Sequence, residues 1–179
     1  MMRASIAGLC NRARPLMTCT ATLAALFGLC SLTGLRINTT GSLPMGIYAM
    51  STAPTADLVE FCPPAPFSRI SAVREYRNPG NCPDGDDPLL KPVVAKEGDR
   101  VLFSGSGLEV NGILLRNTAP RAQDSRGRPL SHYPFGAYRV SADSVWVAST
   151  YHPLSFDSRY FGPIPISAIR NHLKAFLTL

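Results

Sequence analysis

The chain has 179 residues, enough for one domain with a hydrophobic core, and its length gives no reason to expect two. Its formal net charge is +6, but four of its 18 Lys and Arg residues flank an apolar run near the N-terminus. The other 14 basic residues stand against 12 acidic ones, a net charge of +2. This charge, without a basic stripe carrying interleaved aromatic residues, excludes nucleic acid as the expected partner.

The apolar run covers residues 15–35, which are 21 residues without a charge. As a helix it reaches roughly 30 Å, the thickness of a bilayer core. Arg3, Arg12 and Arg14 precede the run and a single Arg36 follows it, so the positive-inside rule places the N-terminus in the cytoplasm and the rest outside. We expect one uncleaved transmembrane helix. A cleaved signal peptide is the alternative.

The stretch Asn38–Tyr48 reads N-T-T-G-S-L-P-M-G-I-Y and contains a candidate nucleophile, Ser42. A serine hydroxyl needs a base within hydrogen-bond reach and donors for the oxyanion that forms. Gly41 lets a substrate carbonyl approach the backbone closely. The alternative interpretation is an ordinary juxtamembrane turn. The three histidines lie in turn-like or terminal sequence and do not indicate a Ser/His/Asp arrangement.

The region after the apolar run is predicted to be mostly β, with a hairpin turn at Asn111–Gly112 and a polar excursion over Arg116–Phe135. A helical period occurs only at the end, over Ile166–Phe176. The predicted strands are Gly46–Met50, Leu58–Phe61, Leu89–Ala95, Val101–Phe103 and Tyr138–Ala148, the last with Val145, Trp146 and Val147 buried.

An irregular stretch rich in Pro, Gly, Asn and Asp runs from Cys62 to Pro88 and is expected to be a loop. Outside the cytoplasm, Cys62 and Cys82 could form a disulfide that stabilises it by about 3 kcal/mol. Two unpaired thiols are the alternative. The other three cysteines lie in or beside the apolar run and have no metal-ligand spacing, so no metal or cofactor is expected.

Two lysines near the third predicted strand are expected to differ in chemistry. In strand periodicity Lys91 shares a face with Leu89, Val93 and Ala95, whereas Lys96 lies in a turn beside two carboxylates. Burial disfavours the ammonium and lowers the pKa of Lys91 towards the range in which a neutral amine accepts a proton. The alternative is an edge-strand lysine whose head group reaches water.

Three motifs occur in the order T-G-S-L-P-M-G-I-Y, L-K-P-V-V-A-K-E-G-D and S-F-D-S-R-Y-F-G-P. Together they resemble the type I signal peptidase family of membrane-anchored Ser/Lys proteases, and within it the conjugative-transfer TraF peptidases. The resemblance covers the apolar run and nearly all of the rest of the chain. It implies a signal-peptidase-like β domain.

The resemblance also implies roles for individual residues. Ser42 falls on the nucleophile, and its backbone N–H would donate to the oxyanion. Thr40 falls where the family often has a serine whose hydroxyl completes the oxyanion hole. Lys91 falls on the general base. The family usually continues with Arg after this lysine, but here Pro92 follows.

In the third motif, the resemblance places Ser155 on the hydroxyl that orients the lysine amine. Asp157 and Arg159 fall on an ion pair that supports the site. Without the other motifs, this pair would be read as a surface ion pair. The family's usual G-D-N before this motif is replaced around residues 149–151, which sets the chain apart from general signal peptidases.

The resulting hypothesis is a serine endopeptidase in the inner membrane. Residues 1–14 would be cytoplasmic, 15–35 the anchor and 36–179 a periplasmic Ser/Lys peptidase domain. Its expected partners are an exported precursor, a conjugative pilin subunit above all, and other transfer proteins. The acyl-enzyme could be resolved by water or by a substrate amine, the latter with cyclisation. The alternatives are a general type I signal peptidase and a non-catalytic, membrane-anchored assembly component.

Overall fold

The computed structural model describes residues 34–53 and 57–179. The chain divides into two units, Met1–Arg36 and Ile37–Leu179. Nearly all of the predicted anchor lies outside the described residues; its last two, Gly34 and Leu35, form a turn and the start of a strand. No helix among the described residues is long and apolar enough to cross a membrane.

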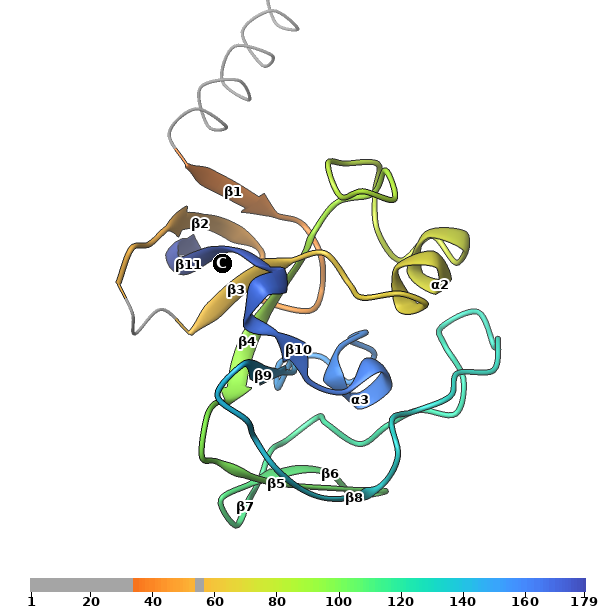
Figure 1. The fold of residues 1–179 in the computed structure, drawn as a ribbon. Coiled ribbons are helices and arrows are strands. Elements are labelled where there is room, and N and C mark those ends of the chain that lie inside the picture. The colour runs from red at the N-terminus through yellow and green to blue at the C-terminus, as the bar shows by residue number, and fades with distance from the viewer. Residues whose placement is uncertain (1–33, 54–56) are drawn as a thin grey trace, which may run out of the picture. The chain divides into compact units, whose positions relative to one another are not determined.

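Two antiparallel sheets make up the domain, which confirms the predicted mainly β class (Figure 1). The order of the larger sheet is β1-β2-β11-β3-β4-β9-β10, and that of the smaller sheet is β7-β6-β5-β8. The strands of the larger sheet are β1 (Leu35–Asn38), β2 (Gly46–Met50), β3 (Leu58–Phe61), β4 (Leu89–Ala95), β9 (Ser144–Val147), β10 (Ile164–Pro165) and β11 (Ile169–Thr178). Those of the smaller sheet are β5 (Arg100–Ser104), β6 (Gly107–Val110), β7 (Ile113–Leu114) and β8 (Gly136–Arg139).

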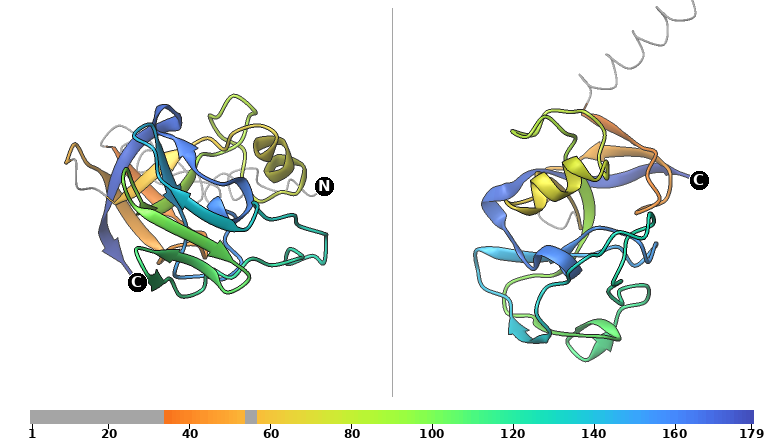
Figure 2. Two further views of the ribbon diagram at one scale, coloured as in Figure 1. Left: turned by 60° about the horizontal axis from the view of Figure 1, so that its bottom comes forward. Right: turned by 90° about the vertical axis from the view of Figure 1, so that its right-hand side faces the viewer.

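The smaller sheet lies at the end of the domain opposite β2 and β11, and β4 runs towards it (Figure 2). The hairpin between β6 and β7 turns at Asn111 and Gly112, whose φ angles of 52° and 86° fit the predicted type I′ turn. The polar stretch between β7 and β8 contains no strand, as predicted. Trp146 on β9 is 1% exposed and packs with Val101, Phe103 and other residues of the smaller sheet, so a shared core joins the sheets.

Two of the predicted elements are wrong in detail. Tyr138–Ala148 is not one strand, because a turn at Ser141–Asp143 sends β8 to the smaller sheet and β9 to the larger. Ile166–Phe176 is not helical. After a short 3₁₀ turn, η1 (Ile166–Ala168), it becomes β11, which pairs with β2 on one side and β3 on the other. The hydrogen bonds that β11 forms along both of its edges stabilise the strand more than the weak helical periodicity of its sequence favours a helix.

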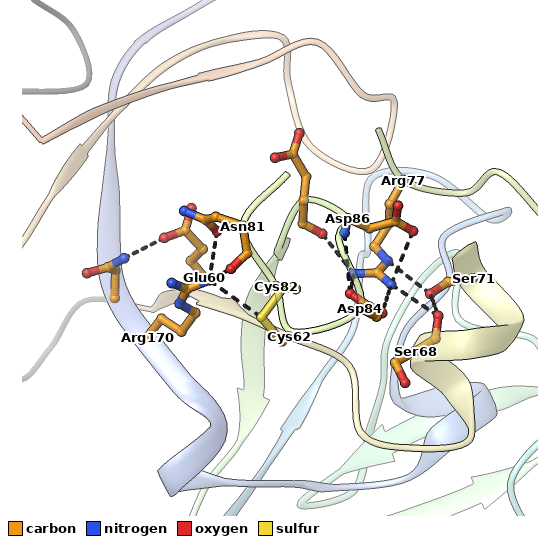
Figure 3. Close-up of a disulfide and its surroundings, with 12 residues drawn as sticks. Glu60, Cys62, Ser68, Ser71, Arg77, Asn81, Cys82, Asp84, Asp86 and Arg170 are labelled. Carbon is orange, nitrogen blue, oxygen red and sulfur yellow. Dashed lines mark hydrogen bonds and ion pairs between the residues drawn. A yellow bond between two sulfur atoms is a disulfide. The ribbon is translucent and has the colours of Figure 1, made fainter. Parts of the chain in front are cut away.

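The Cys62–Pro88 stretch is more ordered than predicted, since it contains helix α2 (Phe67–Val73). The helix is too short to give a clear periodic pattern, and it is held because Phe67 packs on the ring of Phe161, with centroids 5.9 Å apart. The expected disulfide between Cys62 and Cys82 is confirmed (Figure 3).

Arg77 connects the loop that contains Cys82 to helix α2. Its guanidinium donates to the carbonyl of Ser68 and the hydroxyl of Ser71 on the helix, and it forms an ion pair with Asp84 in the loop (Figure 3). The loop is therefore held at two points, the disulfide and this arginine.

Candidate active site

The loop that carries Ser42 joins β1 to β2 and is organised by one buried amide. The Nδ2 group of Asn38 donates to the carbonyl oxygens of Thr40, Leu43 and Pro44 at 3.1, 3.2 and 3.1 Å. Its Oδ1 accepts the backbone N–H of Thr40 at 3.2 Å. Leu43 is buried in a small apolar cluster, so the half-buried Ser42 is fixed between a polar network and a hydrophobic anchor.

The two neighbours of Ser42 in the T-G-S motif differ in what they can contribute. A Cβ on Gly41 would meet only the ring of His152, 3.9 Å away, so packing does not require glycine and this side of the loop is open. Thr40 is exposed, and its hydroxyl donates to Asn38 Oδ1 at 2.7 Å. A role for Thr40 in the oxyanion hole therefore requires this hydrogen bond to break when substrate binds.

Lys91 lies at the centre of β4, opposite Val59 on β3, and is 3% exposed. Burial lowers its pKa from 10.5 to about 8; the nearby Asp157 charge opposes this effect and the Arg159 charge adds to it. Lys96 is exposed in the turn after the same strand. The predicted difference in burial between the two lysines is therefore confirmed.

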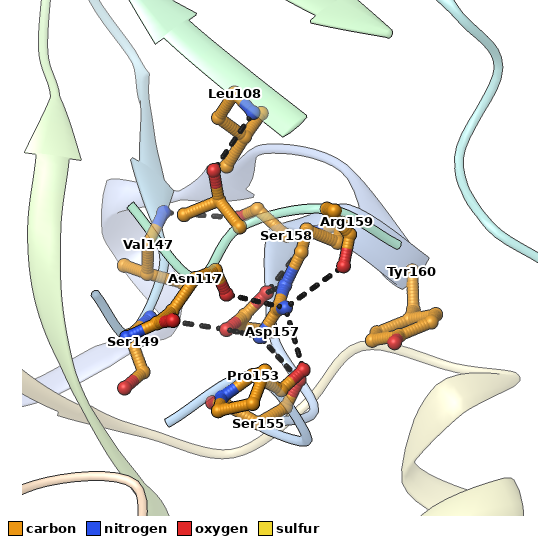
Figure 4. Close-up of polar contacts among 12 residues, drawn as sticks. Leu108, Asn117, Val147, Ser149, Pro153, Ser155, Asp157, Ser158, Arg159 and Tyr160 are labelled. Carbon is orange, nitrogen blue, oxygen red and sulfur yellow. Dashed lines mark hydrogen bonds and ion pairs between the residues drawn. The ribbon is translucent and has the colours of Figure 1, made fainter. Parts of the chain in front are cut away.

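Asp157 and Arg159 form a fully buried ion pair at the start of helix α3 (Ser158–Phe161). Arg159 Nε and Nη2 donate to the two carboxylate oxygens at 2.8 and 2.9 Å (Figure 4). The remaining guanidinium hydrogen bonds go to the carbonyl groups of Asn117, Ala119, Pro153 and Ser155. This arginine ties three chain segments together, and the predicted ion pair is present.

Ser155 is 2% exposed, and its hydroxyl has no hydrogen-bond partner within the described part of the chain. Unpaired buried hydroxyl groups are uncommon in native proteins, because their desolvation is not compensated. The Lys91 amine likewise forms no hydrogen bond with any of residues 34–53 and 57–179. The predicted base and the predicted hydroxyl that orients it thus both have polar atoms free of hydrogen bonds to these residues.

The two residues that follow β9, Ala148 and Ser149, form hydrogen bonds with three separate parts of the proposed site. The hydroxyl of Ser149 donates to the carbonyl oxygen of Ser42 at 2.5 Å. The Ser149 N–H donates to Asp157 Oδ2 at 3.0 Å (Figure 4). The preceding residue, Ala148, donates its N–H to the carbonyl of Pro92, next to the lysine, at 3.1 Å. No hydrogen bond joins Ser42 directly to Lys91 among the described residues.

Sequence reasoning missed Asn38 and Ser149 as site residues. A signal for Asn38 existed, because an Asn two residues before a Thr-Gly pair is typical of a side chain that hydrogen-bonds the following turn. Ser149 gave no such signal, since its partner Ser42 is 107 residues away in the chain. No three His, Cys, Asp or Glu side chains in the described ranges are grouped so that they could hold a metal ion.

A family model for signal peptidase, peptidase S26, matches residues 34–178, and the chain belongs to this family. Its curated relatives include a plasmid transfer protein TraF of Escherichia coli, 38% identical over 86% of this chain and 88% of that protein. A probable conjugal transfer protein TraF of Sinorhizobium fredii is 37% identical over 94% of this chain and 92% of its own length.

A solved signal peptidase I from Enterococcus faecalis aligns with 70% of this chain and all of its own, at 17% identity and a TM-score of 0.38.

Proposed function

We propose that this chain is a membrane-anchored serine endopeptidase in which Ser42 is the nucleophile and Lys91 the general base. The burial of Lys91 carries the proposal. With a pKa of about 8, roughly a tenth of this lysine is a neutral amine at pH 7, whereas an ordinary lysine is almost entirely charged. Membership of the peptidase S26 family supports the same assignment.

In the proposed reaction, Lys91 takes the proton of the Ser42 hydroxyl as the serine oxygen attacks the scissile carbonyl. The Ser42 N–H, with Thr40 once its hydroxyl is released, donates to the oxyanion. Collapse of the tetrahedral intermediate breaks the C–N bond, and Lys91 returns the proton to the leaving amine. The Ser155 hydroxyl, which has no hydrogen-bond partner among residues 34–53 and 57–179, orients the lysine amine, and the Asp157–Arg159 pair supports this arrangement.

The proposed substrate is an exported precursor used in conjugative transfer, a pilin subunit in particular. The names of the TraF relatives support this context. We further propose that the apolar run from residue 15 to residue 33 anchors the chain in the inner membrane, with residues 1–14 in the cytoplasm and the domain that begins at β1 in the periplasm. Ser42 is only seven residues beyond Leu35, so the reaction would take place near the membrane surface, where an exported segment emerges.

The acyl-enzyme can be resolved in two ways. Attack by water gives a linear acid. Attack by an amine of the same substrate gives a cyclic product, whose mass is lower than that of the linear acid by one water molecule. Processing of the pilin precursor should therefore be followed by mass spectrometry in cells that carry the wild type, Ser42→Ala, Lys91→Ala or Lys96→Ala.

We expect Ser42→Ala and Lys91→Ala to abolish maturation, and Lys96→Ala, the exposed lysine on the same segment, to leave it unchanged. Normal processing in all three variants would contradict the dyad and favour an assembly role for the chain. Cleavage of ordinary secretory precursors, instead of pilin, would keep the dyad but contradict the proposed substrate.

A further inference from the structure

We infer that Ser149 is a positioning residue for the nucleophile: its hydroxyl holds the Ser42 loop against the strand that carries the proposed base. This inference rests on the proposed function. It begins with the 2.5 Å hydrogen bond from Ser149 Oγ to the carbonyl oxygen of Ser42, a contact between residues 107 positions apart.

The orientation of this hydroxyl is fully determined by its partners. A serine hydroxyl has one proton to donate and two lone pairs to accept with. The backbone N–H groups of Tyr151 and His152 occupy both lone pairs, each at 3.1 Å. The one proton is therefore directed at Ser42. Because Ser149 is 0% exposed, water does not compete for these bonds.

The backbone on either side of this hydroxyl reaches the other half of the site. The Ser149 N–H donates to Asp157, whose carboxylate is held by Arg159 and whose charge acts on Lys91. The Ala148 N–H donates to the carbonyl of Pro92 on β4, directly after Lys91. Ser149 is thus bonded to the base side through its main chain and to the nucleophile side through its hydroxyl.

Loss of the hydroxyl alone should free the nucleophile loop and leave the base side unchanged. The effect on rate should be large, because a displacement of about 1 Å between reacting groups can cost on the order of 100-fold. For Ser149→Ala in the full chain acting on purified pilin precursor, we expect kcat to fall by roughly 10- to 100-fold and KM to stay within about twofold. The pH at which kcat/KM levels off should stay near 8, since the main-chain bond to Asp157 remains.

The matched control is Ser71→Ala. Ser71 lies on helix α2 and is also 0% exposed. Its hydroxyl also donates to a backbone carbonyl, that of Ser68 on the same helix, at 2.8 Å. We expect kcat of this variant to stay within about twofold of the wild type. Ser149→Thr, which keeps a hydroxyl, should recover most of the activity lost in Ser149→Ala.

Hydrogen exchange of residues 38–44 provides a readout that does not depend on catalysis. The lost hydrogen bond should make exchange of this segment roughly three- to tenfold faster in Ser149→Ala and leave it unchanged in Ser71→Ala. Unchanged exchange together with wild-type kcat in Ser149→Ala would overturn the inference, as would an equal loss of kcat in Ser71→Ala. Full activity of Ser42→Ala would instead refute the proposed peptidase function, while the exchange measurement would still test the contact.

Discussion

Replacement of Lys91 by Met should make the protein more stable at neutral pH although it removes the proposed base. Burial lowers the pKa of Lys91 from 10.5 to about 8, a difference of about 2.5 pH units. Each unit is worth about 1.36 kcal/mol, so the buried ammonium costs about 3 kcal/mol of folding free energy. Methionine has a similar shape and carries no charge, so it avoids this cost.

The sign of the pH dependence follows from proton binding. Between about pH 8 and pH 10.5 the unfolded chain holds a proton on Lys91 that the folded chain has released, so the free energy of unfolding rises with pH. The free-energy cost of burying the Lys91 ammonium is fully present below about pH 8 and is lost above about pH 10.5. The stability advantage of Lys91→Met should therefore shrink by about 3 kcal/mol from pH 7 to pH 10.5.

Urea unfolding of the full chain in one detergent, followed by the fluorescence of Trp146, measures this difference. Trp146 is the only tryptophan and is 1% exposed in the folded domain. Lys96→Met is the control, because that lysine is exposed and its replacement should give no pH-dependent difference. A constant difference between wild type and Lys91→Met over pH 7–10.5 would refute the reasoning, since it would mean that Lys91 titrates as it does in the unfolded chain.

Four other outcomes are expected. Wild-type kcat/KM should rise about tenfold per pH unit up to about pH 8 and then level off, because only the neutral lysine accepts a proton. Ser155→Ala should lower kcat by roughly 10- to 100-fold and change the free energy of unfolding by less than about 1 kcal/mol, because its hydroxyl makes no hydrogen bond to the described residues in the absence of substrate. Asp157→Asn should cost about 3–5 kcal/mol in urea unfolding, since it leaves Arg159 buried without its counter-charge. Replacement of Cys62 and Cys82 by Ser should cost about 3 kcal/mol in the same assay, because their bond closes a loop of 20 residues.

A different experimental result would contradict each of these four predictions. A pH–rate profile that keeps rising through pH 10 would mean that the base has an ordinary lysine pKa. A large loss of stability in Ser155→Ala would show that the hydroxyl has a structural partner. Wild-type stability of Asp157→Asn would mean that the guanidinium does not need the carboxylate, and unchanged stability of the double Cys variant would mean that the loop holds without its disulfide.

Much of the domain could be predicted from local sequence. Short runs rich in apolar and β-branched residues predicted the strands Gly46–Met50, Leu58–Phe61 and Leu89–Ala95, and Asn111–Gly112 predicted its hairpin turn, because these signals depend on neighbouring residues only. The opposite burial of Lys91 and Lys96 followed from the two-residue period of a strand and from the turn that comes after it. The T-G-S, L-K-P and D-S-R motifs were enough to identify the family before any geometry was known.

Features that depend on contacts distant in the sequence were decided only by the tertiary structure. The C-terminal segment became strand β11 because β2 and β3 offered hydrogen-bonding edges on both sides, which no local pattern could reveal. The burial of the Ser155 hydroxyl and the hydrogen bond from Ser149 to Ser42 likewise exist only once the chain is folded. Short-range periodicity thus determined the strands and the burial of the lysine, whereas long-range packing and hydrogen bonding determined how the nucleophile loop is held.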